Sequence, residues 1–162
     1  IILLQAPARA EYMRKELTMR LNLDCVRQIL LIVEENTGLR KYCFFIDSSL
    51  SECQTASGDS LIPLPDYQTN LLKKVDNDEL IYHINYCVEA GLLSMDTSYG
   101  LYQLVIKGLT PKGHDFLENI RDNKIWSGVK NIAANVGSTS LDAITQIASN
   151  VIIQLIKSQF GI

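Results

Sequence analysis

The fold is decided by residues 78–113, which read DELIYHINYCVEAGLLSMDTSYGLYQLVIKGLTPKG. The first part of this stretch places apolar side chains three and four residues apart, which predicts a helix over residues 78–90. Asp76 or Asn77 can cap the start of this helix, and Gly91 is suited to end it. The stretch therefore opens with a helix whose two ends are encoded locally.

A β-hairpin and a second helix follow. Residues 92–95 and 101–107 are predicted to pair as strands through a turn at residues 96–100. Thr110 then caps a helix, and Pro111 takes its first position, where a missing N–H costs nothing. This order of helix, hairpin and helix is typical of a winged helix-turn-helix core.

The rest of the chain adds helices. We therefore predict a mainly α fold with a small β-hairpin (the α+β class), in which a winged helix-turn-helix core carries a C-terminal helical extension. Residues 1–18 are read as an N-terminal extension or a segment foreign to the native chain, 19–122 as the winged-helix domain, and 123–162 as helices for packing or oligomerisation. The further predicted elements are a helix over 23–37 capped by Asn22 or Asp24, a strand over 41–46, a loop over 47–66, one or two helical turns over 68–74, and helices over 110–122, 125–136 and 140–160.

The composition is that of an ordinary globular protein. Apolar residues make up 47% of the 162 residues and charged residues 20%. A chain of this size and composition can bury a core without disulfides or a bound metal to stabilise it. The net charge of −3 gives no overall basic character that would attract nucleic acid. No stretch approaches the roughly 18 uninterrupted apolar residues of a membrane span. We therefore expect a cytoplasmic protein without a membrane contact.

The four cysteines are Cys25, Cys43, Cys53 and Cys87. Their spacings include no C-x-x-C motif and no metal-site pairing with a histidine, so we expect no metal site and no cofactor. Cys43 and Cys53 could pair in an oxidising compartment. Reduced thiols are the favoured interpretation, because free thiols are typical of cytoplasmic proteins.

Several segments resemble known proteins. The sequences EAGLL at residues 89–93 and LTPKG at residues 109–113 resemble the junctions on either side of the wing in bacterial winged-helix regulators. A closer resemblance is to an uncharacterised family of small bacterial and prophage proteins, and covers residue 19 to the end. It implies a winged-helix fold and a Firmicutes-like or phage setting, but no activity. The segments that carry it are residues 19–27, 78–84 and 113–122, and Trp126.

The predicted helix over residues 78–90 would be the recognition helix, which lies in the major groove of DNA in this class of fold. Tyrosine and asparagine contact phosphates or base edges, and lysine contacts phosphates. Tyr82, His83 and Tyr86 are expected to point outward. The candidate residues for binding DNA or a protein partner are Lys73, Lys74, Tyr82, His83, Asn85, Tyr86 and Lys107.

The local charge opposes DNA binding. Residues 61–109 contain three lysines and six acidic residues, and the predicted turn at 96–100 contains no basic residue. Non-specific affinity for DNA comes mainly from neutralising phosphates, and this region supplies few cations for that purpose. A basic patch elsewhere could be formed by Arg20, Arg27, Arg40 and Lys41.

The sequence contains no recognisable catalytic constellation. His114 is expected to be an ordinary residue in the first turn of its helix, because the second histidine, His83, has no evident triad partners. Asp115, Glu118 and Asp122 are read as a solvated helix face. With no phosphate-binding loop and no pairing of a nucleophile with a base, the chain is predicted not to be an enzyme.

The last predicted helix is apolar over much of its circumference, so it must be buried on more than one side. It could pack on the body, pair with its copy in a homodimer or cover a partner. Four polar residues interrupt it, which disfavours membrane insertion: Gln146, Asn150, Gln154 and Lys157. The candidate oligomerisation residues are Leu141, Ile144, Ala148, Val151, Ile152 and Leu155.

Two hypotheses for function remain. The first is a winged-helix DNA-binding regulator of bacterial or phage origin that acts as a dimer. The second is a phage or prophage protein-interaction module that modulates a host factor through an acidic, tyrosine-containing face. DNA binding is slightly favoured, and this preference rests only on analogy with other proteins of the same fold.

Overall fold

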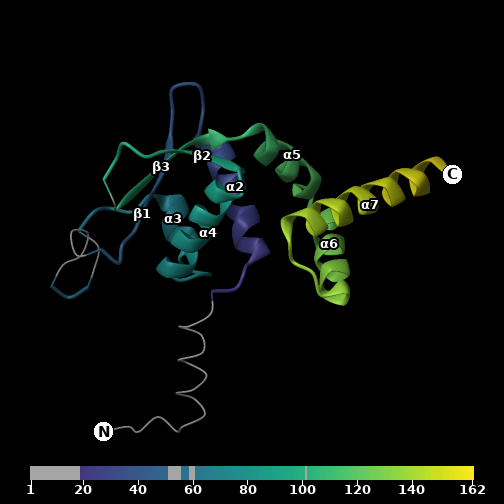
Figure 1. Cartoon of the computed structure of the whole chain (residues 1–162), viewed down its shortest axis with the longest axis horizontal. Helices are drawn as coiled ribbons and strands as arrows, with labels where there is room; N and C mark the ends of the chain where they lie inside the picture. The colour runs from purple at the N-terminus through teal and green to yellow at the C-terminus, as the bar shows by residue number, and fades with distance from the viewer. Residues whose placement is uncertain (1–18, 51–55, 59–60, 101) are drawn as a thin grey trace, which may run out of the picture.

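The computed structural model describes residues 19–50, 56–58, 61–100 and 102–162. The predicted extension over residues 1–18 lies outside these residues, as does Cys53. The described part is mainly helical with a small antiparallel sheet, so the predicted α+β class is confirmed (Figure 1). In chain order the elements are α2 (Leu23–Asn36), β1 (Cys43–Ile46), α3 (Asp66–Leu71), α4 (Asn77–Glu89), β2 (Leu93–Asp96), β3 (Gln103–Leu109), α5 (Pro111–Ile120), α6 (Asn123–Val136) and α7 (Leu141–Phe160).

Side-chain caps set the beginnings of the main helices. The carboxamide oxygen of Asn22 accepts a hydrogen bond from the backbone N–H of Cys25, so Asn22 rather than Asp24 caps α2. At α4 the cap is Asp76, which accepts from the backbone N–H of Glu79. Local chemistry therefore fixes these helix starts where the sequence placed them, to within one residue.

The junction between α5 and α6 differs from the prediction. Helix α5 ends at Ile120 instead of Asp122, and α6 begins at Asn123 instead of Ile125. The reason is that the Asp122 carboxylate accepts hydrogen bonds from the backbone N–H groups of Lys124 and Ile125. Asp122 is thus an N-cap of α6 and not part of a solvated face of α5.

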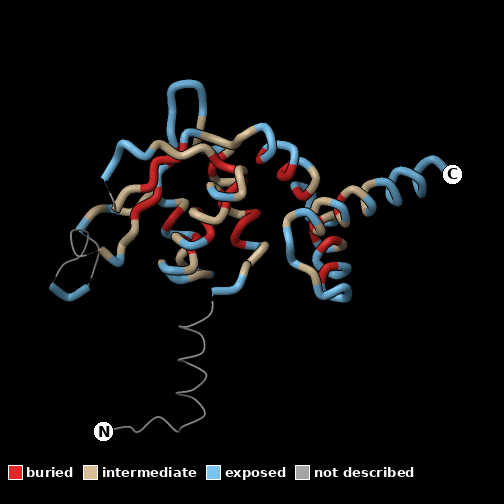
Figure 2. The backbone as a smooth tube through the Cα atoms, in the orientation of Figure 1, coloured by how far each residue is buried: buried red, intermediate tan, exposed pale blue. Residues whose placement is uncertain are grey.

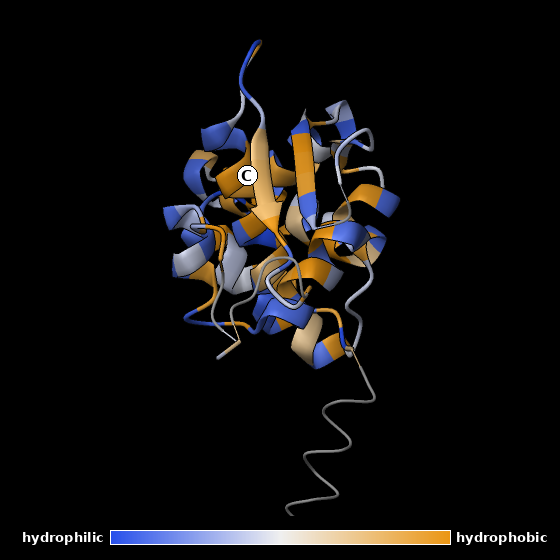
Figure 3. Ribbon diagram, turned by 90° about the vertical axis from the view of Figure 1, so that its left-hand side faces the viewer, coloured by the Kyte–Doolittle hydropathy of each residue, from blue (hydrophilic) through white to orange (hydrophobic). Residues whose placement is uncertain are grey.

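The sheet has three strands in the order β1–β3–β2. Strands β2 and β3 form the predicted hairpin, with a bulge between Ser94 and Met95. Strand β1 pairs antiparallel with the other edge of β3 and aligns Cys43 with Ile106. The predicted hairpin is therefore part of a larger sheet, whose strands are mainly hydrophobic (Figure 3).

The outer edge of β1 is covered by side chains from α3. Gln68 is fully buried, and its side-chain amide donates to the carbonyl of Ile46 at 2.6 Å and accepts from its N–H at 2.9 Å. The Tyr67 hydroxyl bonds the N–H and the carbonyl of Phe44 in the same way. These contacts satisfy backbone groups that an edge strand otherwise leaves unpaired.

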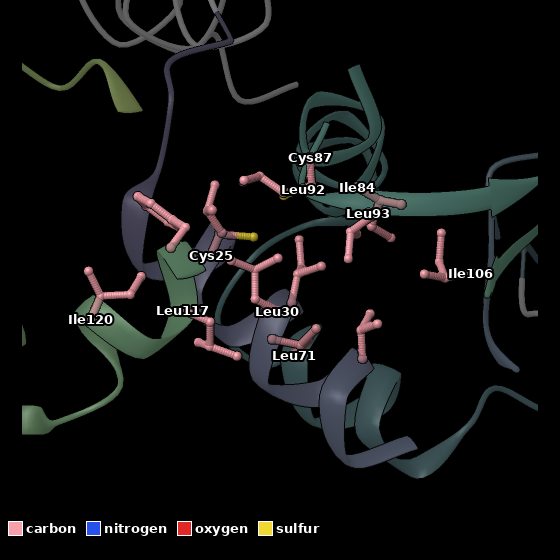
Figure 4. Close-up of a cluster of buried hydrophobic side chains, with 14 of the residues drawn as sticks. Cys25, Leu30, Leu71, Ile84, Cys87, Leu92, Leu93, Ile106, Leu117 and Ile120 are labelled. Carbon is pink, nitrogen blue, oxygen red and sulfur yellow. The ribbon is translucent and has the colours of Figure 1, made fainter. Parts of the chain in front are cut away.

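One hydrophobic cluster joins the helices to the inner face of the sheet. Figure 2 shows the buried segments of the helices and strands facing one another at the centre. In Figure 4, Leu30 of α2, Ile84 of α4 and Ile106 of β3 lie in this cluster. The cluster extends through Leu117 of α5 to Ile144 of α7, so it includes side chains from the C-terminal helices.

Polar contacts also attach the C-terminal helices to α2. Arg27 is buried, and its guanidinium donates to the carbonyl oxygen of Ile120 at 2.8 Å, to that of Arg121 and to the side chain of Asn123. The guanidinium therefore occupies the bend between α5 and α6. Arg27 was expected to contribute to a basic surface patch, and this expectation is wrong because its charge is used internally.

Candidate functional site

The surface that matters most for the predicted function is the outer side of α4 together with the β2–β3 hairpin, which we call the α4–hairpin face. Tyr82 is the most exposed tyrosine of α4, with 37% of its surface accessible. Asp78 and Glu89 are exposed, whereas Asn85 and Tyr86 are half-buried. The helix thus presents a surface that is polar, aromatic and acidic.

His83 does not belong to this surface, and its prediction as an outward-pointing contact residue is wrong. Its side chain is fully buried. Nε2 accepts the backbone N–H of Asn22 at 2.7 Å, and Nδ1 lies 2.7 Å from the carbonyl oxygen of Glu79. Since Nε2 accepts, Nδ1 must carry the proton and donate it to Glu79. The ring therefore ties the start of α2 to the first turns of α4.

A cleft of about 310 Å³ lies between α4 and the hairpin. Its large apolar side chains are Ile81, Met95 and Leu104, and its polar side chains are two carboxylates, two amides, a threonine and a tyrosine. Of the predicted binding residues only Asn85 lines this cleft. The full set of lining residues is Asp47, Ile81, Asn85, Met95, Asp96, Thr97, Tyr99, Gly100, Gln103 and Leu104.

The two carboxylates of the cleft are stabilised in their charged form. Burial by itself would raise the pKa of Asp47, but hydrogen bonds from Ser49 and Asn77 outweigh it and hold that pKa below its ordinary value. Hydrogen bonds from the hydroxyl and the N–H of Ser98 lower the pKa of Asp96. Both groups are therefore negatively charged at neutral pH.

The predicted lysines lie outside the cleft. Lys73 and Lys74 are exposed in the turn between α3 and α4, where the ammonium of Lys73 donates to the side chain of Asn70. Lys107 is exposed on β3. Arg40 and Lys41 are exposed at a separate turn, which is closed by backbone hydrogen bonds between Gly38 and Lys41. None of these five side chains lines the cleft.

Sequence reasoning missed most of the residues that line the cleft. Asp47, Tyr99 and Gln103 come from the segment after β1, from the hairpin turn and from β3, and no local pattern links them. They come together only because β3 pairs with both neighbouring strands. The excess of acidic residues over residues 61–109 was a signal for Asp96 but not for Asp47, which lies outside that segment.

A larger cleft, of about 490 Å³, lies beside the first turn of α2 and α6. Four of its polar side chains are paired with one another. The Asn22 amide donates to Glu79 at 2.8 Å, and the ammonium of Lys130 lies 3.0 Å from the carboxylate of Asp24. None of the residues predicted to bind DNA or a protein partner lines this larger cleft, so the α4–hairpin face is the better candidate site.

Two of the predicted oligomerisation residues are also inaccessible. Ile144 and Ala148 are fully buried within the chain, so their assignment to a subunit interface is wrong. They pack on the body because this stripe of α7 lies against α5 and α6. Leu141, Val151 and Ile152 are half-buried, and Leu155 is exposed.

Two further findings concern the described residues. They contain no group of three or more histidine, cysteine or acidic side chains arranged to hold a metal ion. Among the helices they form, none combines the length and apolar character needed to cross a bilayer.

Comparison with known proteins identifies the family. Residues 20–140 match the family described as "Hypothetical protein (DUF2513)". An uncharacterized protein of Haemophilus influenzae (strain KW20 / Rd) is 30% identical over 141 residues, which cover 85% of this chain and 99% of that protein. No solved structure matches the chain. The predicted membership of a family without assigned function is confirmed, whereas the winged-helix assignment and the phage setting stay predictions. The chain belongs to the DUF2513 family.

Proposed function

We propose that this chain is a non-enzymatic winged-helix module that binds a protein partner through the α4–hairpin face. The observation that carries the proposal is the cleft between α4 and the hairpin, which combines the carboxylates of Asp47 and Asp96 with apolar side chains and Tyr99. Apolar surface beside tyrosines is typical of protein interfaces, where aromatic side chains supply much of the binding energy.

The charge of the cleft indicates the chemistry of the partner. A segment with a lysine or arginine would place its cation between Asp47 and Asp96 and lay its aliphatic stem along Ile81 and Met95. Complementary charges of this kind speed association and exclude wrong partners. The partner segment is therefore basic and extended enough to enter the cleft.

The same surface is poorly suited to DNA. A phosphate backbone lying against α4 and the hairpin would meet Asp78, Glu89 and Asp96 on the elements that should approach it. His83, one of the residues expected to reach the bases, is buried. Each of these features lowers the affinity for DNA, because binding to phosphates depends on cations.

DNA binding is the second candidate, and two observations favour it. The order of α2, β1, α3, α4 and the hairpin agrees with that expected for a winged helix. Lys73 and Lys74 are exposed in the turn just before α4, where cations would contact phosphates next to a groove. A regulator that acts as a dimer would double these contacts.

A photo-crosslinking experiment tests the protein-binding proposal. A photoreactive amino acid is placed at Asn85 in the cleft and, as the matched control, at Asp115 on the exposed surface of α5. We expect a discrete protein adduct from position 85 in bacterial cells, with a basic peptide at the crosslink, and none from position 115. Equal adducts at both positions, or an acidic crosslinked peptide, would contradict the proposal.

Charge removal then measures the contribution of the cleft. Asp47→Asn and Asp96→Asn keep the side-chain shape, and each should weaken binding of the identified partner by about tenfold, or about 1.4 kcal/mol. Asp115→Asn should leave the affinity unchanged.

Titration of a labelled DNA duplex separates the two candidates. Protein binding predicts only weak association at low salt, which Lys73→Gln and Lys74→Gln leave unaltered. Tight binding that falls steeply with salt and is lost in the double lysine variant would establish DNA as the ligand and refute the proposal.

A further inference from the structure

Helix α7 changes character along its length. Its first half packs on α5 and α6, and Ile144 and Ala148 are fully buried there. Every residue from Ile153 to the end of the helix is exposed. In Figures 1 and 2 this second half projects from the body into open space. A helical segment of this length is marginal in water without tertiary contacts, so a partner is expected along it.

The projecting half presents an apolar stripe that the packed half lacks. Ile153, Ile156 and Phe160 are spaced by three and four residues, so they share one face of the helix. They are 46%, 47% and 73% exposed. On the same face of the first half the corresponding residues are Thr145, Gln146 and Ser149, all of them polar. The apolar stripe therefore begins only where α7 leaves the body.

The small residues of the first half are suited to a close helix contact. The Thr145 hydroxyl donates to the carbonyl of Leu141 at 2.8 Å, and the Ser149 hydroxyl donates to that of Thr145 at 3.0 Å. Because their protons are bonded within the helix, these side chains require no external acceptor. They leave room on the face for a larger side chain from a second helix.

The charges of α7 are self-complementary in one orientation. Asp142 near its start and Lys157 near its end are its only charged residues, and both are exposed. Neither takes part in the ion pairs found among the described residues. In an antiparallel pair of α7 helices, each Lys157 lies opposite the Asp142 of the other copy when the two-fold axis passes between Ser149 and Asn150. A parallel pair would instead bring like charges together.

We propose that α7 pairs with the α7 of a second copy of this chain, antiparallel and centred next to Ser149. The large apolar side chains of each projecting half then lie over the face of the other packed half that carries Thr145, Gln146 and Ser149. A 20-residue helix is about 30 Å long, so the whole of α7 takes part. This pairing uses a face different from the buried stripe of Ile144 and Ala148, and it is independent of what binds to the α4–hairpin face.

Sedimentation of the full chain over a range of concentrations tests the oligomeric state. We expect a dimer for the native sequence and a monomer for Ile156→Glu, with unchanged circular dichroism. Gln154→Glu adds the same charge to the exposed helix surface away from the stripe and should remain a dimer. A native chain that is monomeric throughout, or an Ile156→Glu chain that still dimerises, overturns the proposal.

Disulfide trapping tests the orientation, in a Cys53→Ser background that removes one competing thiol. Mixed Asp142→Cys and Lys157→Cys chains should form a disulfide-linked heterodimer under mild oxidation. Lys157→Cys alone should not, because the two copies of residue 157 lie at opposite ends of an antiparallel pair. Crosslinking of Lys157→Cys with itself would establish a parallel pair, and no crosslinking in the mixture would exclude the proposed register.

A charge exchange provides an independent measurement. Lys157→Asp should raise the dissociation constant of the dimer, and adding Asp142→Lys should restore it. If the dimer of the double variant dissociated as readily as that of Lys157→Asp, the pairing of these two residues would be contradicted.

Discussion

At the scale of single residues, His83 has the clearest structural role. Its two ring nitrogens bond the backbone of two different helices, so one neutral side chain fixes the start of α2 against α4. Asn22 takes part twice, through its N–H to His83 and through its amide to Glu79. A buried polar group that is fully bonded in this way favours a unique arrangement of the helices around it.

Replacement of His83 by leucine should therefore lower stability. The backbone N–H of Asn22 loses its acceptor, and an unpaired buried donor costs about 1–3 kcal/mol. The free energy of unfolding in urea measures this loss. His114→Leu changes an exposed histidine on α5 and should stay within about 0.5 kcal/mol of the native value. A loss no greater for His83 than for His114 would show that these hydrogen bonds do not matter.

The cysteines of the core should be chemically inert in the folded chain. Burial raises the pKa of Cys25 to about 12, and that of Cys87 to about 12 as well, so almost no thiolate exists near neutral pH. Cys43 is also buried and has a raised pKa. These three described cysteines are free thiols.

Thiol titration checks this expectation. In a Cys53→Ser chain, Ellman's reagent at pH 8 should label the three remaining thiols only as fast as the chain unfolds. The same chain in denaturant serves as the control and should release three equivalents at once. Rapid labelling of the folded protein would mean that at least one of Cys25, Cys43 and Cys87 is accessible.

At the scale of elements, the position of α3 is explained by the edge of β1. Gln68 and Tyr67 supply the hydrogen bonds that a fourth strand would otherwise make to Phe44 and Ile46. Tyr67 also packs its ring against Phe45, with the ring centroids 5.5 Å apart. The short helix α3 thus closes the sheet on this side.

Gln68→Met should destabilise the chain because it keeps the volume but removes both hydrogen bonds to Ile46. We expect a loss of about 1–3 kcal/mol from the unpaired backbone groups. Thermal and urea unfolding measure it. Thr69→Val, at the next and exposed position of α3, is the control and should change stability little. If Gln68→Met left the stability unchanged, the hydrogen bonds from Gln68 to β1 would not contribute to it.

At the scale of the whole molecule, Asp24 connects the first helix to the C-terminal ones. Its carboxylate accepts from the indole N–H of Trp126 at 2.7 Å and from the ammonium of Lys130 at 3.0 Å. Burial tends to raise the pKa of Asp24, but these two partners outweigh it and hold that pKa below its ordinary value. The contact therefore favours the folded state only while the carboxylate is charged.

The sign of the pH dependence follows from this shift. The stabilisation from Asp24 is fully present above its unfolded pKa of about 4 and is lost as the pH falls through the lower folded pKa. We expect stability to fall below pH 4, and to fall less steeply in Asp24→Asn. At pH 7 the variant should lose at most about 1 kcal/mol, because the Asp24 side chain is 59% exposed.

Urea unfolding at pH 7, 4 and 3 measures both effects. Asp115→Asn removes an exposed carboxylate on α5 and serves as the control. Parallel pH profiles for Asp24→Asn and the native chain would show that the bridge to Trp126 does not contribute to acid sensitivity.

The sequence by itself determined the elements and most of their ends. Helix periodicity and local caps such as Asp76 and Thr110 act within a few residues, so they can be predicted without knowledge of the fold. The α+β class and the β2–β3 hairpin followed from the same local signals. The role of Gly113 did not, although the sequence contained it in a recognisable junction. A Cβ at this position would lie 2.0 Å from the carbonyl oxygen of Leu92, a contact made only in the folded chain.

Only the tertiary structure decided which polar and apolar side chains are free to bind. His83 is buried because the start of α2 lies against α4, and Ile144 is buried because α7 lies against α5 and α6. The helix period gives a side chain its direction around its own axis, but not which neighbour occupies that direction. The cleft residues Asp47 and Tyr99 are likewise brought to one place by strand pairing. Contacts between segments distant in sequence therefore set the candidate site, whereas neighbours in sequence set the helices and strands.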